Sequence, residues 1–199
     1  EYLVKDAVKT VTSTQESICK ADGETRYHIA LLDFGVKYNI ERELQSRGCE
    51  VTVLPGDSDP QEILSGGFDG VMLTNGPGDP AENVQIVANL KVLVESGIPI
   101  FGICLGHQLM ALAIGAKTEK MRFGHRGVNH PVKDIDLDRT YITSQNHGYA
   151  VVKDSVDPAV ARVRYVNLND GSVEGIVHIN RPVFTVQFHP EVCPGPMDT

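Results

Sequence analysis

The sequence predicts an α/β fold with a mostly parallel central sheet, helices on both faces of that sheet, and antiparallel strands added to it. Between residues 27 and 113, short apolar runs alternate with helical patterns, which is typical of strands that pair in parallel through helical crossovers. After Gly115 the pattern changes to short strands that follow one another, and this favours antiparallel pairing. In such a sheet, functional side chains collect where the parallel strands end.

The first strand, helix and strand form a β-α-β unit. Residues 27–32 are a short apolar run, and a helix is expected over residues 36–47 because its apolar side chains fall on one stripe. Gly48 is a typical residue at the end of a helix, and the next strand is expected at residues 50–54. This unit predicts two parallel strands joined by a right-handed crossover.

The same alternation continues towards Cys104. A short helix is expected at residues 61–64, a strand at residues 70–73 and a longer helix at residues 82–95, which has an apolar stripe. An apolar run bounded by turn residues then leads to Cys104, and this pattern predicts a buried strand. These elements extend the parallel sheet.

The second part of the chain predicts antiparallel additions at one side of the parallel sheet. Strands are expected at residues 117–121, 140–144, 149–152, 162–167, 174–178 and 183–188. Between two of them, Asn169, Asp170 and Gly171 have the composition of a hairpin turn.

The length of 199 residues suits one α/β domain with a substantial core. The first 26 residues are polar, so we expect a linker or the tail of a missing N-terminal domain there, followed by one domain over residues 27–199. The chain begins without Met and ends in a Pro/Gly-rich stretch, which suggests a piece of a longer protein with a truncated C-terminal end.

Composition restricts the class of partner and the compartment. The formal net charge of −8 argues against nucleic acid or an anionic membrane surface as the main partner. The four cysteines stand far apart, which favours reduced thiols in the cytoplasm. No apolar run reaches about 18 residues, so no transmembrane helix is expected.

Cys104 is the candidate nucleophile. With Gly102 and Gly106 it forms Gly-x-Cys-x-Gly, which matches the nucleophile elbow Gly-x-Ser-x-Gly with sulfur in place of oxygen. A helix that begins at Leu105 would direct its unpaired N–H groups and its positive dipole end at the sulfur, which favours the reactive thiolate. The alternative is that Cys104 is a small buried apolar residue.

His189 and Glu191 are the candidate base and its orienting carboxylate. They follow the strand expected at residues 183–188, and residues two apart in an extended segment point to the same side. Pro190 between them restricts His189 to extended conformations. The spacing suits a Cys-His-Glu triad, although His-x-Glu also occurs in surface loops. The other histidines considered as bases are weaker candidates: His107, for which we expect a site-lining or packing role, His125 and His130 in an expected loop, and His147.

Two other kinds of site were weighed. Zinc ligands come in close pairs, and only His125 and His130 have a suggestive separation, without a companion pair, so no metal site is predicted. The loop at residues 75–80 follows a strand but lacks the Gly-Lys-Ser/Thr ending of a P-loop. It suits an oxyanion loop, in which glycine N–H groups act together with the Leu105 N–H, or a plain tight turn.

The motifs resemble those of the class I, triad-type glutamine amidotransferases. The residues that carry this resemblance are Gly-Ile-Cys104-Leu-Gly-His-Gln108, the later His189-Pro-Glu191 and the upstream Asn-Gly76-Pro-Gly78. Blocks at residues 123–132, 144–151 and 189–198 are specifically similar to the small, glutamine-hydrolysing subunit of carbamoyl-phosphate synthetase. The resemblance extends over about residues 27–198 and implies the flavodoxin-like sheet of that family.

The resemblance implies a role for each matching position. Cys104 would be the nucleophile, His189 the base and then the acid, and Glu191 the orienting carboxylate. Gly76 and Leu105 would donate backbone N–H groups to the oxyanion. Positions that hold the α-amino and α-carboxylate groups of glutamine correspond to Gly78, Gln108, Asn146, Gly148 and Tyr149. The family usually has Phe at the last of these positions. We also expect this chain to lack the family's first domain, which contributes a serine contact, and its final helix.

The implied activity is hydrolysis of L-glutamine to glutamate and ammonia through a cysteine thioester. In the family, ammonia passes through a tunnel to a large subunit, which uses bicarbonate and ATP to make carbamoyl phosphate for pyrimidine or arginine biosynthesis. No cofactor is expected in this chain, since ATP and Mg²⁺ belong to the large subunit. The expected partners are L-glutamine, the missing N-terminal domain and that large subunit.

Three alternatives remain open at the level of sequence. They are an amidotransferase domain that serves another synthetase, a cysteine hydrolase of the γ-glutamyl hydrolase type, and a non-catalytic assembly domain. The complete set of Cys104, His189 and Glu191 weighs against the last of these, because a degenerate homologue can lose any of the three without losing its fold.

Overall fold

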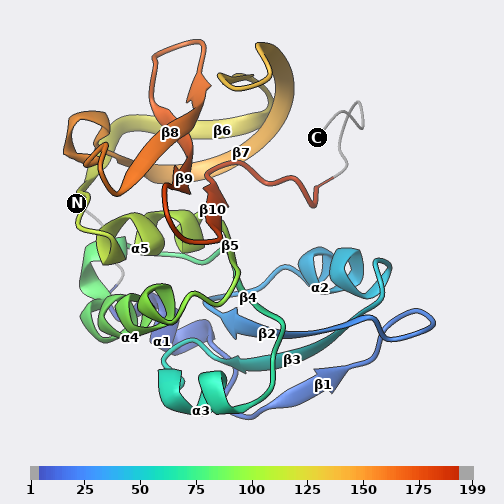
Figure 1. Cartoon of the computed structure of the whole chain (residues 1–199). Helices are drawn as coiled ribbons and strands as arrows, with labels where there is room; N and C mark the ends of the chain where they lie inside the picture. The colour runs from blue at the N-terminus through green and yellow to red at the C-terminus, as the bar shows by residue number, and fades with distance from the viewer. Residues whose placement is uncertain (1–4, 193–199) are drawn as a thin grey trace.

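One sheet runs through the part of the chain that the computed structural model describes, residues 5–192. The order of its strands is β1-β3-β2-β4-β5-β10-β9-β8-β6-β7 (Figure 1). Its parallel strands are β2 (Tyr27–Asp33), β3 (Cys49–Pro55), β4 (Gly70–Leu73), β5 (Ile100–Ile103) and β10 (Val183–Val186). In chain order these five strands lie 2-1-3-4-5 across the sheet, which is the flavodoxin-like order and confirms the predicted fold class.

The antiparallel strands lie at both edges of this parallel core. They are β1 (Ser17–Cys19), which pairs with β3, and β9 (Val173–His178), β8 (Ala161–Asn167), β6 (Thr118–Asp134) and β7 (Arg139–Val151) beyond β10. Strands β6 and β7 form a long curved ribbon, at the top of Figure 1. The predicted hairpin turn at residues 169–171 connects β8 to β9, as expected.

Three expectations about the second half of the chain were wrong. The strand expected at residues 183–188 is not simply an antiparallel addition, because β10 pairs in parallel with β5 and antiparallel with β9. The loop expected around His125 and His130 is part of β6, and the strands expected at residues 140–144 and 149–152 are one strand, β7. These polar stretches form strands because the two halves of the ribbon pair through backbone hydrogen bonds, which do not require apolar side chains. Shifts in the register accommodate the residues that do not pair regularly.

The predicted helices cover both faces of the sheet. They are α2 (Tyr38–Gln45), α3 (Pro60–Ser65), α4 (Val84–Ser96) and α5 (Leu105–Ala113). The structure adds three short helices that the sequence did not predict: α1 (Ala7–Val11), η1 (Pro80–Glu82) and η2 (Lys153–Ser155). Leu32 packs with Leu90 of α4 and Leu109 of α5 on one face. The neighbouring Leu31 packs with Ile40 of α2 on the opposite face. Because successive strand residues point to opposite faces, apolar strands such as β2 are buried on both sides.

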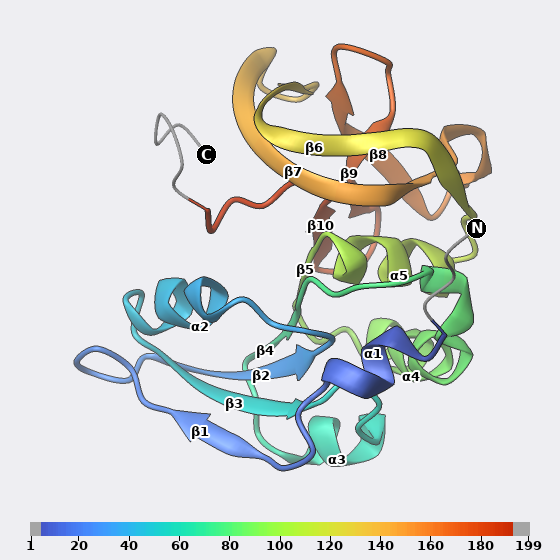
Figure 2. The ribbon, with the colours of Figure 1, turned by 180° about the vertical axis from the view of Figure 1, so that it is seen from behind.

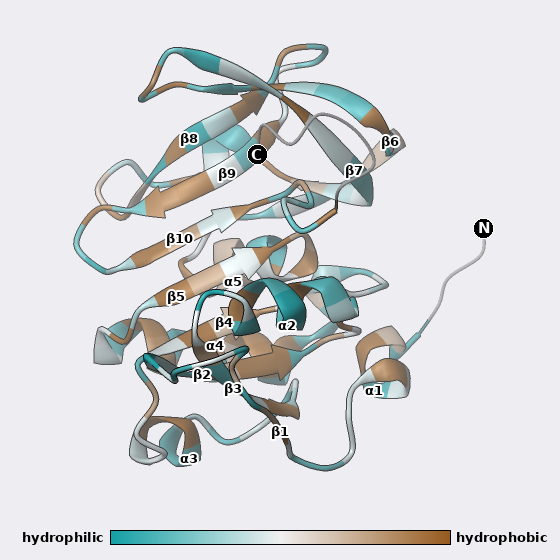
Figure 3. Ribbon diagram, turned by 90° about the vertical axis from the view of Figure 1, so that its right-hand side faces the viewer, coloured by the Kyte–Doolittle hydropathy of each residue, from teal (hydrophilic) through white to brown (hydrophobic). Residues whose placement is uncertain are grey.

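The arrangement of layers is visible when the molecule is turned. In Figure 3, α2 lies in front of the sheet, α4 lies behind it, and the central strands are mostly apolar. Local signals set the helix ends: Pro60 begins α3 after Asp59, whose carboxylate accepts a hydrogen bond from the Gln61 N–H at 2.7 Å. Gly97 ends α4 with a φ of 80°, a conformation that favours glycine.

The N-terminal segment contributes to the sheet and to the core. Strand β1 lies at the outer edge of the sheet next to β3 (Figure 2), and Ala7 and Val8 of α1 are buried. The Ser13 N–H donates to the carboxylate of Asp33 at 2.8 Å, which ties the segment to the end of β2. The domain boundary expected between residues 26 and 27 stays a prediction. In the described residues, no helix is long and apolar enough to span a membrane.

Candidate active site

Cys104 lies at the turn between β5 and α5, as the elbow pattern predicts. Its φ of 54° and ψ of −103° are unusual for a residue other than glycine, so the backbone is strained at this position. The Cys104 N–H donates to the carbonyl of Val186 at 2.9 Å, and its carbonyl accepts from the Gln108 N–H at 3.2 Å. These bonds to β10 and α5 hold the cysteine in the strained conformation.

The two glycines of the elbow are required by close packing. A Cβ on Gly106 would lie 2.5 Å from the carbonyl oxygen of Leu73, and a Cβ on Gly102 would lie 3.0 Å from the backbone of Gly106. The first helical turn therefore sits directly against β4 and β5, and only glycine allows this approach. The same closeness brings Cys104 to the carboxyl ends of the parallel strands.

His189 and Glu191 form a buried pair beside Cys104. Nδ1 of His189 lies 2.8 Å from Oε1 of Glu191, and both side chains are 3% exposed. Strand β10 ends at Val186, and Glu191 lies in a turn, so extended geometry is not what aligns the pair. Instead, the His189 N–H donates to the carbonyl of Ser144 at 3.0 Å, and Asn39 donates to the carbonyl of Glu191 at 3.0 Å.

The environment of His189 favours its protonated form. Burial alone lowers the pKa of an imidazole, but side-chain hydrogen bonds with Cys104 and with Glu191 outweigh it and raise the pKa of His189 to about 9. Since Nδ1 faces Glu191, Nε2 is the ring nitrogen left to address the cysteine. Lys37 also reaches this pair, with Nζ 3.3 Å from Nδ1 of His189 and 4.0 Å from Oε1 of Glu191.

Gly76 and Leu105 lie together opposite the cysteine. Leu105 is the first residue of α5, and N–H groups of a first helical turn have no partner within the helix. Gly76 lies so close to Phe34 that a Cβ would be 2.2 Å from the Phe34 carbonyl oxygen, and 2.7 Å from Cδ2 of Leu105. Asn75 fixes this loop, because its amide donates to the carbonyl of Gly35 at 2.9 Å. The arrangement can present two backbone N–H groups to one oxyanion.

A cavity of about 370 Å³ opens beside Cys104. It includes every residue that the sequence predicts for the α-amino and α-carboxylate groups of the substrate: Gly78, Gln108, Asn146, Gly148 and Tyr149. Nε2 of Gln108 donates to the Tyr149 carbonyl at 2.8 Å, which joins α5 to the wall formed by β7. A neighbouring pocket is lined by Cys104, Asn146 and His189, so the cavity and the Cys-His pair adjoin.

His107 has the packing role that the sequence indicates. It is fully buried, its Nδ1 lies 2.7 Å from Oγ1 of Thr185, and burial lowers its pKa to about 3. It stays neutral and holds α5 against β10.

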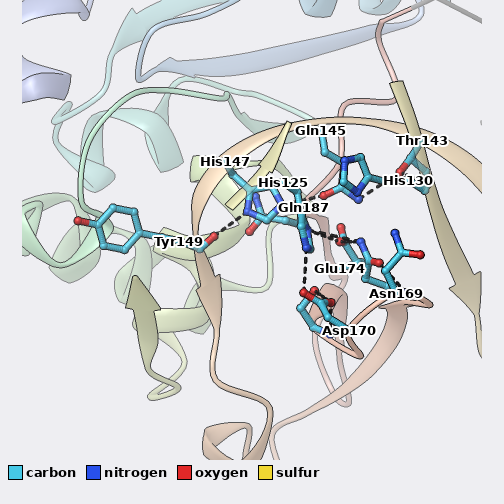
Figure 4. A network of polar contacts seen from close by, with 12 residues as sticks. His125, His130, Thr143, Gln145, His147, Tyr149, Asn169, Asp170, Glu174 and Gln187 are labelled. Atoms are coloured by element: carbon cyan, nitrogen blue, oxygen red, sulfur yellow. Dashed lines mark hydrogen bonds and ion pairs between the residues drawn. The ribbon is translucent and has the colours of Figure 1, made fainter. Parts of the chain in front are cut away.

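Sequence reasoning missed several residues of the site. Lys37 and Asn39, near the start of α2, have no motif, and they reach His189 and Glu191 only through the fold. It also missed a cluster of His125, His147 and Glu174, of which His147 lines the cavity (Figure 4). The separation between His125 and His130 was the one available signal, and it pointed to the wrong second histidine.

The comparisons with known proteins agree with this geometry. A model of the family "Glutamine amidotransferase class-I" matches residues 30–199. The carbamoyl phosphate synthase small chain of Symbiobacterium thermophilum is 54% identical over 171 residues, covering 85% of this chain and 47% of that protein. The protein of the same name from Bacillus caldolyticus is 49% identical over 194 residues, 98% of this chain and 52% of the relative. The chain thus spans about half the length of these curated relatives.

Solved structures share the fold. A putative GMP synthase protein from Thermoplasma acidophilum is 25% identical with a TM-score of 0.73, covering 85% of this chain and 87% of the other. A glutamine amidotransferase from Thermotoga maritima is 17% identical with a TM-score of 0.66, covering 83% and 76%. Since the family model covers most of the chain, the protein belongs to the class I glutamine amidotransferase family.

Proposed function

We propose that this chain is the glutaminase domain of a carbamoyl phosphate synthase small chain, and that it hydrolyses L-glutamine to glutamate and ammonia. The observation that carries the proposal is the buried row of Cys104, His189 and Glu191 at the edge of a cavity. A thiol, an imidazole and a carboxylate in this order form an activated nucleophile. Identities near 50% to proteins named carbamoyl phosphate synthase small chain support the choice of family member.

The first half of the reaction forms a thioester. The thiolate of Cys104 attacks the side-chain carboxamide carbon of glutamine, and the carbonyl π electrons move onto oxygen. The Gly76 and Leu105 N–H groups stabilise this oxyanion. When the carbon–nitrogen bond breaks, the imidazolium of His189 gives its proton to the nitrogen, which leaves as ammonia. Glu191 holds the ring in the orientation that both proton transfers need.

The second half of the reaction restores the cysteine. His189, now neutral, takes a proton from water, and the hydroxide attacks the γ-glutamyl thioester carbon. The carbon–sulfur bond breaks, glutamate leaves, and the thiolate of Cys104 again faces an imidazolium. Because each proton taken is returned, one glutamine and one water give one glutamate and one ammonia.

The cavity wall binds the amino-acid end of glutamine. We place its α-amino and α-carboxylate groups against Gly78, Gln108, Asn146, Gly148 and Tyr149. Tyr149 contacts glutamine through its backbone. Its carbonyl oxygen lies at the cavity, where it accepts a hydrogen bond from Nε2 of Gln108 at 2.8 Å. Its side chain turns towards Asp79, and burial together with the charge of Asp79 raises the pKa of the phenol.

The remaining parts of the proposal concern the larger protein. Residues 27–199 form the amidotransferase domain, and the first 26 residues connect it to an N-terminal domain that helps to bind glutamine. Ammonia passes to a synthetase large subunit in the cytoplasm, where ATP, Mg²⁺ and bicarbonate are used. This chain itself needs no cofactor for the hydrolysis, since the nucleophile, acid and oxyanion donors are all protein groups.

The test is a glutaminase assay in three settings. Ammonia and glutamate are measured for this chain alone, for the chain rejoined to a small-chain N-terminal half, and for that protein mixed with a carbamoyl phosphate synthase large subunit. We expect equal amounts of the two products, and a rate that rises when the large subunit binds. Hydrolysis without any complex or stimulation would point to another synthetase, and the absence of hydrolysis from every setting would contradict the proposed activity.

A further inference from the structure

Three potential metal ligands meet at the wall of the substrate cavity, which His147 lines. His125 comes from β6, His147 from β7 and Glu174 from β9, and all three side chains are buried (Figure 4). One potential ligand atom of each lies within 4.8 Å of the other two. Two imidazoles and a carboxylate at this spacing are a donor set that zinc sites use.

The outer atoms of both histidines are held by acceptors. Nε2 of His125 lies 2.9 Å from Oδ2 of Asp170, and Nδ1 of His147 lies 2.8 Å from the carbonyl of Tyr149. Metal-binding histidines commonly donate their second N–H to a carboxylate or a backbone carbonyl in this way, which orients the ring and fixes its tautomer. In this tautomer Nδ1 of His125 and Nε2 of His147 carry the lone pairs.

Glu174 completes the set. Its Oε1 accepts from Nδ2 of Asn167 at 2.8 Å and lies 3.4 Å from Nδ1 of His125. Its Oε2 is fully buried and has no hydrogen-bond partner among residues 5–192, while the side chain as a whole is 0% exposed. A buried carboxylate oxygen without a partner is costly, and coordination of a cation removes that cost.

The ring of His147 faces two hydrogen-bond acceptors at once. Its Nε2 is 2.7 Å from Oε1 of Gln145, although Nδ1 already faces the carbonyl oxygen of Tyr149. A neutral imidazole has only one N–H, so it can donate to only one of these two oxygens. Nε2 is therefore a lone pair against an amide oxygen, and a cation that both atoms can bind relieves the repulsion.

From these contacts we infer that His125, His147 and Glu174 bind one divalent transition-metal ion, for which Zn²⁺ is the best match. Imidazole nitrogens exclude Mg²⁺ and Ca²⁺, which prefer oxygen ligands throughout. The fourth position goes to water or to Oε1 of Gln145. Because the ligands come from three strands, the ion fastens the β6–β7 ribbon to β9 and thereby braces the part of β7 that contains Asn146 and Gly148. The inference does not rest on the proposed glutamine hydrolysis, although His147 lines the same cavity.

Protons compete with a metal ion for histidine and carboxylate ligands, so binding is measured at mildly alkaline pH.

The experiment measures metal binding by the chelator-treated protein, with Cys104→Ser as the background variant so that the active-site thiol cannot bind the ion. Zn²⁺ is titrated in competition with a chromophoric chelator, and Co²⁺ is used as a spectroscopic probe. We expect one ion per chain, visible d–d bands of Co²⁺ bound to nitrogen and oxygen, and a higher melting temperature with Zn²⁺.

Variants distinguish this site from chance binding. Glu174→Gln keeps the shape of the side chain, and His147→Asn removes one imidazole; each is expected to weaken Zn²⁺ binding at least about tenfold. His130→Asn is the matched control, since His130 is a neighbouring histidine outside the donor group, and it should bind as the parent does. Failure of the background protein to bind one ion, or equal binding by all variants, would overturn the inference whether or not the protein hydrolyses glutamine.

Discussion

Nδ1 of His189 lies 2.8 Å from Oε1 of Glu191, and the contact is buried beside the cysteine at the strand–helix turn. Neither residue belongs to a strand or a helix. Their positions depend on bonds to distant segments, with Ser144 of β7 holding His189 and Asn39 of α2 holding Glu191. The catalytic pair is therefore positioned jointly by the parallel sheet, the antiparallel ribbon and one helix.

Glu191→Gln tests the role of the carboxylate. The amide keeps the size of the side chain but removes the negative charge that stabilises the His189 imidazolium. We expect kcat for glutamine hydrolysis to fall by about 10²- to 10⁴-fold, the range associated with loss of acid–base catalysis. Steady-state ammonia release measures this. Glu95→Gln, an exposed change on α4, should retain the parent rate, and a Glu191→Gln protein as active as this control would argue against a triad.

The pH dependence of hydrolysis tests the protonation state of His189. Its pKa is raised from 6.5 to about 9, so the imidazolium that protonates the departing nitrogen is present below about pH 9 and is lost above it. We expect kcat/KM to decline as the pH rises through about 9, and the decline to move to lower pH in Glu191→Gln. By linkage, the same shift adds stability that is fully present below pH 6.5 and is lost as the pH rises through about 9. A rate that stays constant to higher pH would exclude His189 as the acid.

Gly76→Ala tests the oxyanion loop. The new Cβ would lie 2.2 Å from the Phe34 carbonyl, so the loop has to move and the Gly76 N–H loses its direction. We expect kcat to fall roughly 10²- to 10³-fold, as for loss of one oxyanion donor. Gly115→Ala is the control: its φ of 92° also strains an alanine, but no heavy atom lies within 4 Å of the new Cβ. It should cost about 1–3 kcal/mol of stability and leave kcat intact, as urea unfolding and ammonia assays would reveal.

Tyr149→Phe and Gln108→Ala separate backbone from side-chain contributions in the cavity. Removal of the phenol oxygen should change KM for glutamine by no more than about fivefold, because one hydrogen bond contributes about 1 kcal/mol. Gln108→Ala removes bonds to the Tyr149 carbonyl and to Gln187, leaving buried groups unpaired, and should raise KM at least about tenfold. If Tyr149→Phe had the larger effect on KM, the side chain and not the backbone would contact glutamine.

Much of the fold could be predicted because apolar periodicity is a local property. The strand expected at residues 70–73 is β4, and the expected helix at 82–95 overlaps α4 (Val84–Ser96) within two residues. The direction of β10 could not be predicted in the same way. It depends on the path of the chain through the ribbon between β5 and β10, and hydropathy along a strand carries no information about which neighbour it pairs with.

The same distinction applies to the site. Cys104 and the pair around Pro190 stand in short motifs that can be recognised in the sequence, and the structure places them together. The local sequence does not give the alignment of His189 and Glu191, which depends on hydrogen bonds to Ser144 and Asn39. Lys37 and the cluster of His125 and Glu174 were not predictable, because their contacts arise from tertiary folding. The distances in sequence between His125, His147 and Glu174 match no known ligand spacing, so they do not show that side chains from three strands converge.

The covalent step is the central claim, and it is tested by trapping the intermediate. The chain, joined to a small-chain N-terminal half and bound to a large subunit, is mixed with glutamine and quenched in acid, and the mass of the small chain and its peptides is measured. We predict a γ-glutamyl adduct on the peptide that contains Cys104, and neither adduct nor ammonia from a folded Cys104→Ser variant. Release of ammonia by that variant at the parent rate would contradict the account.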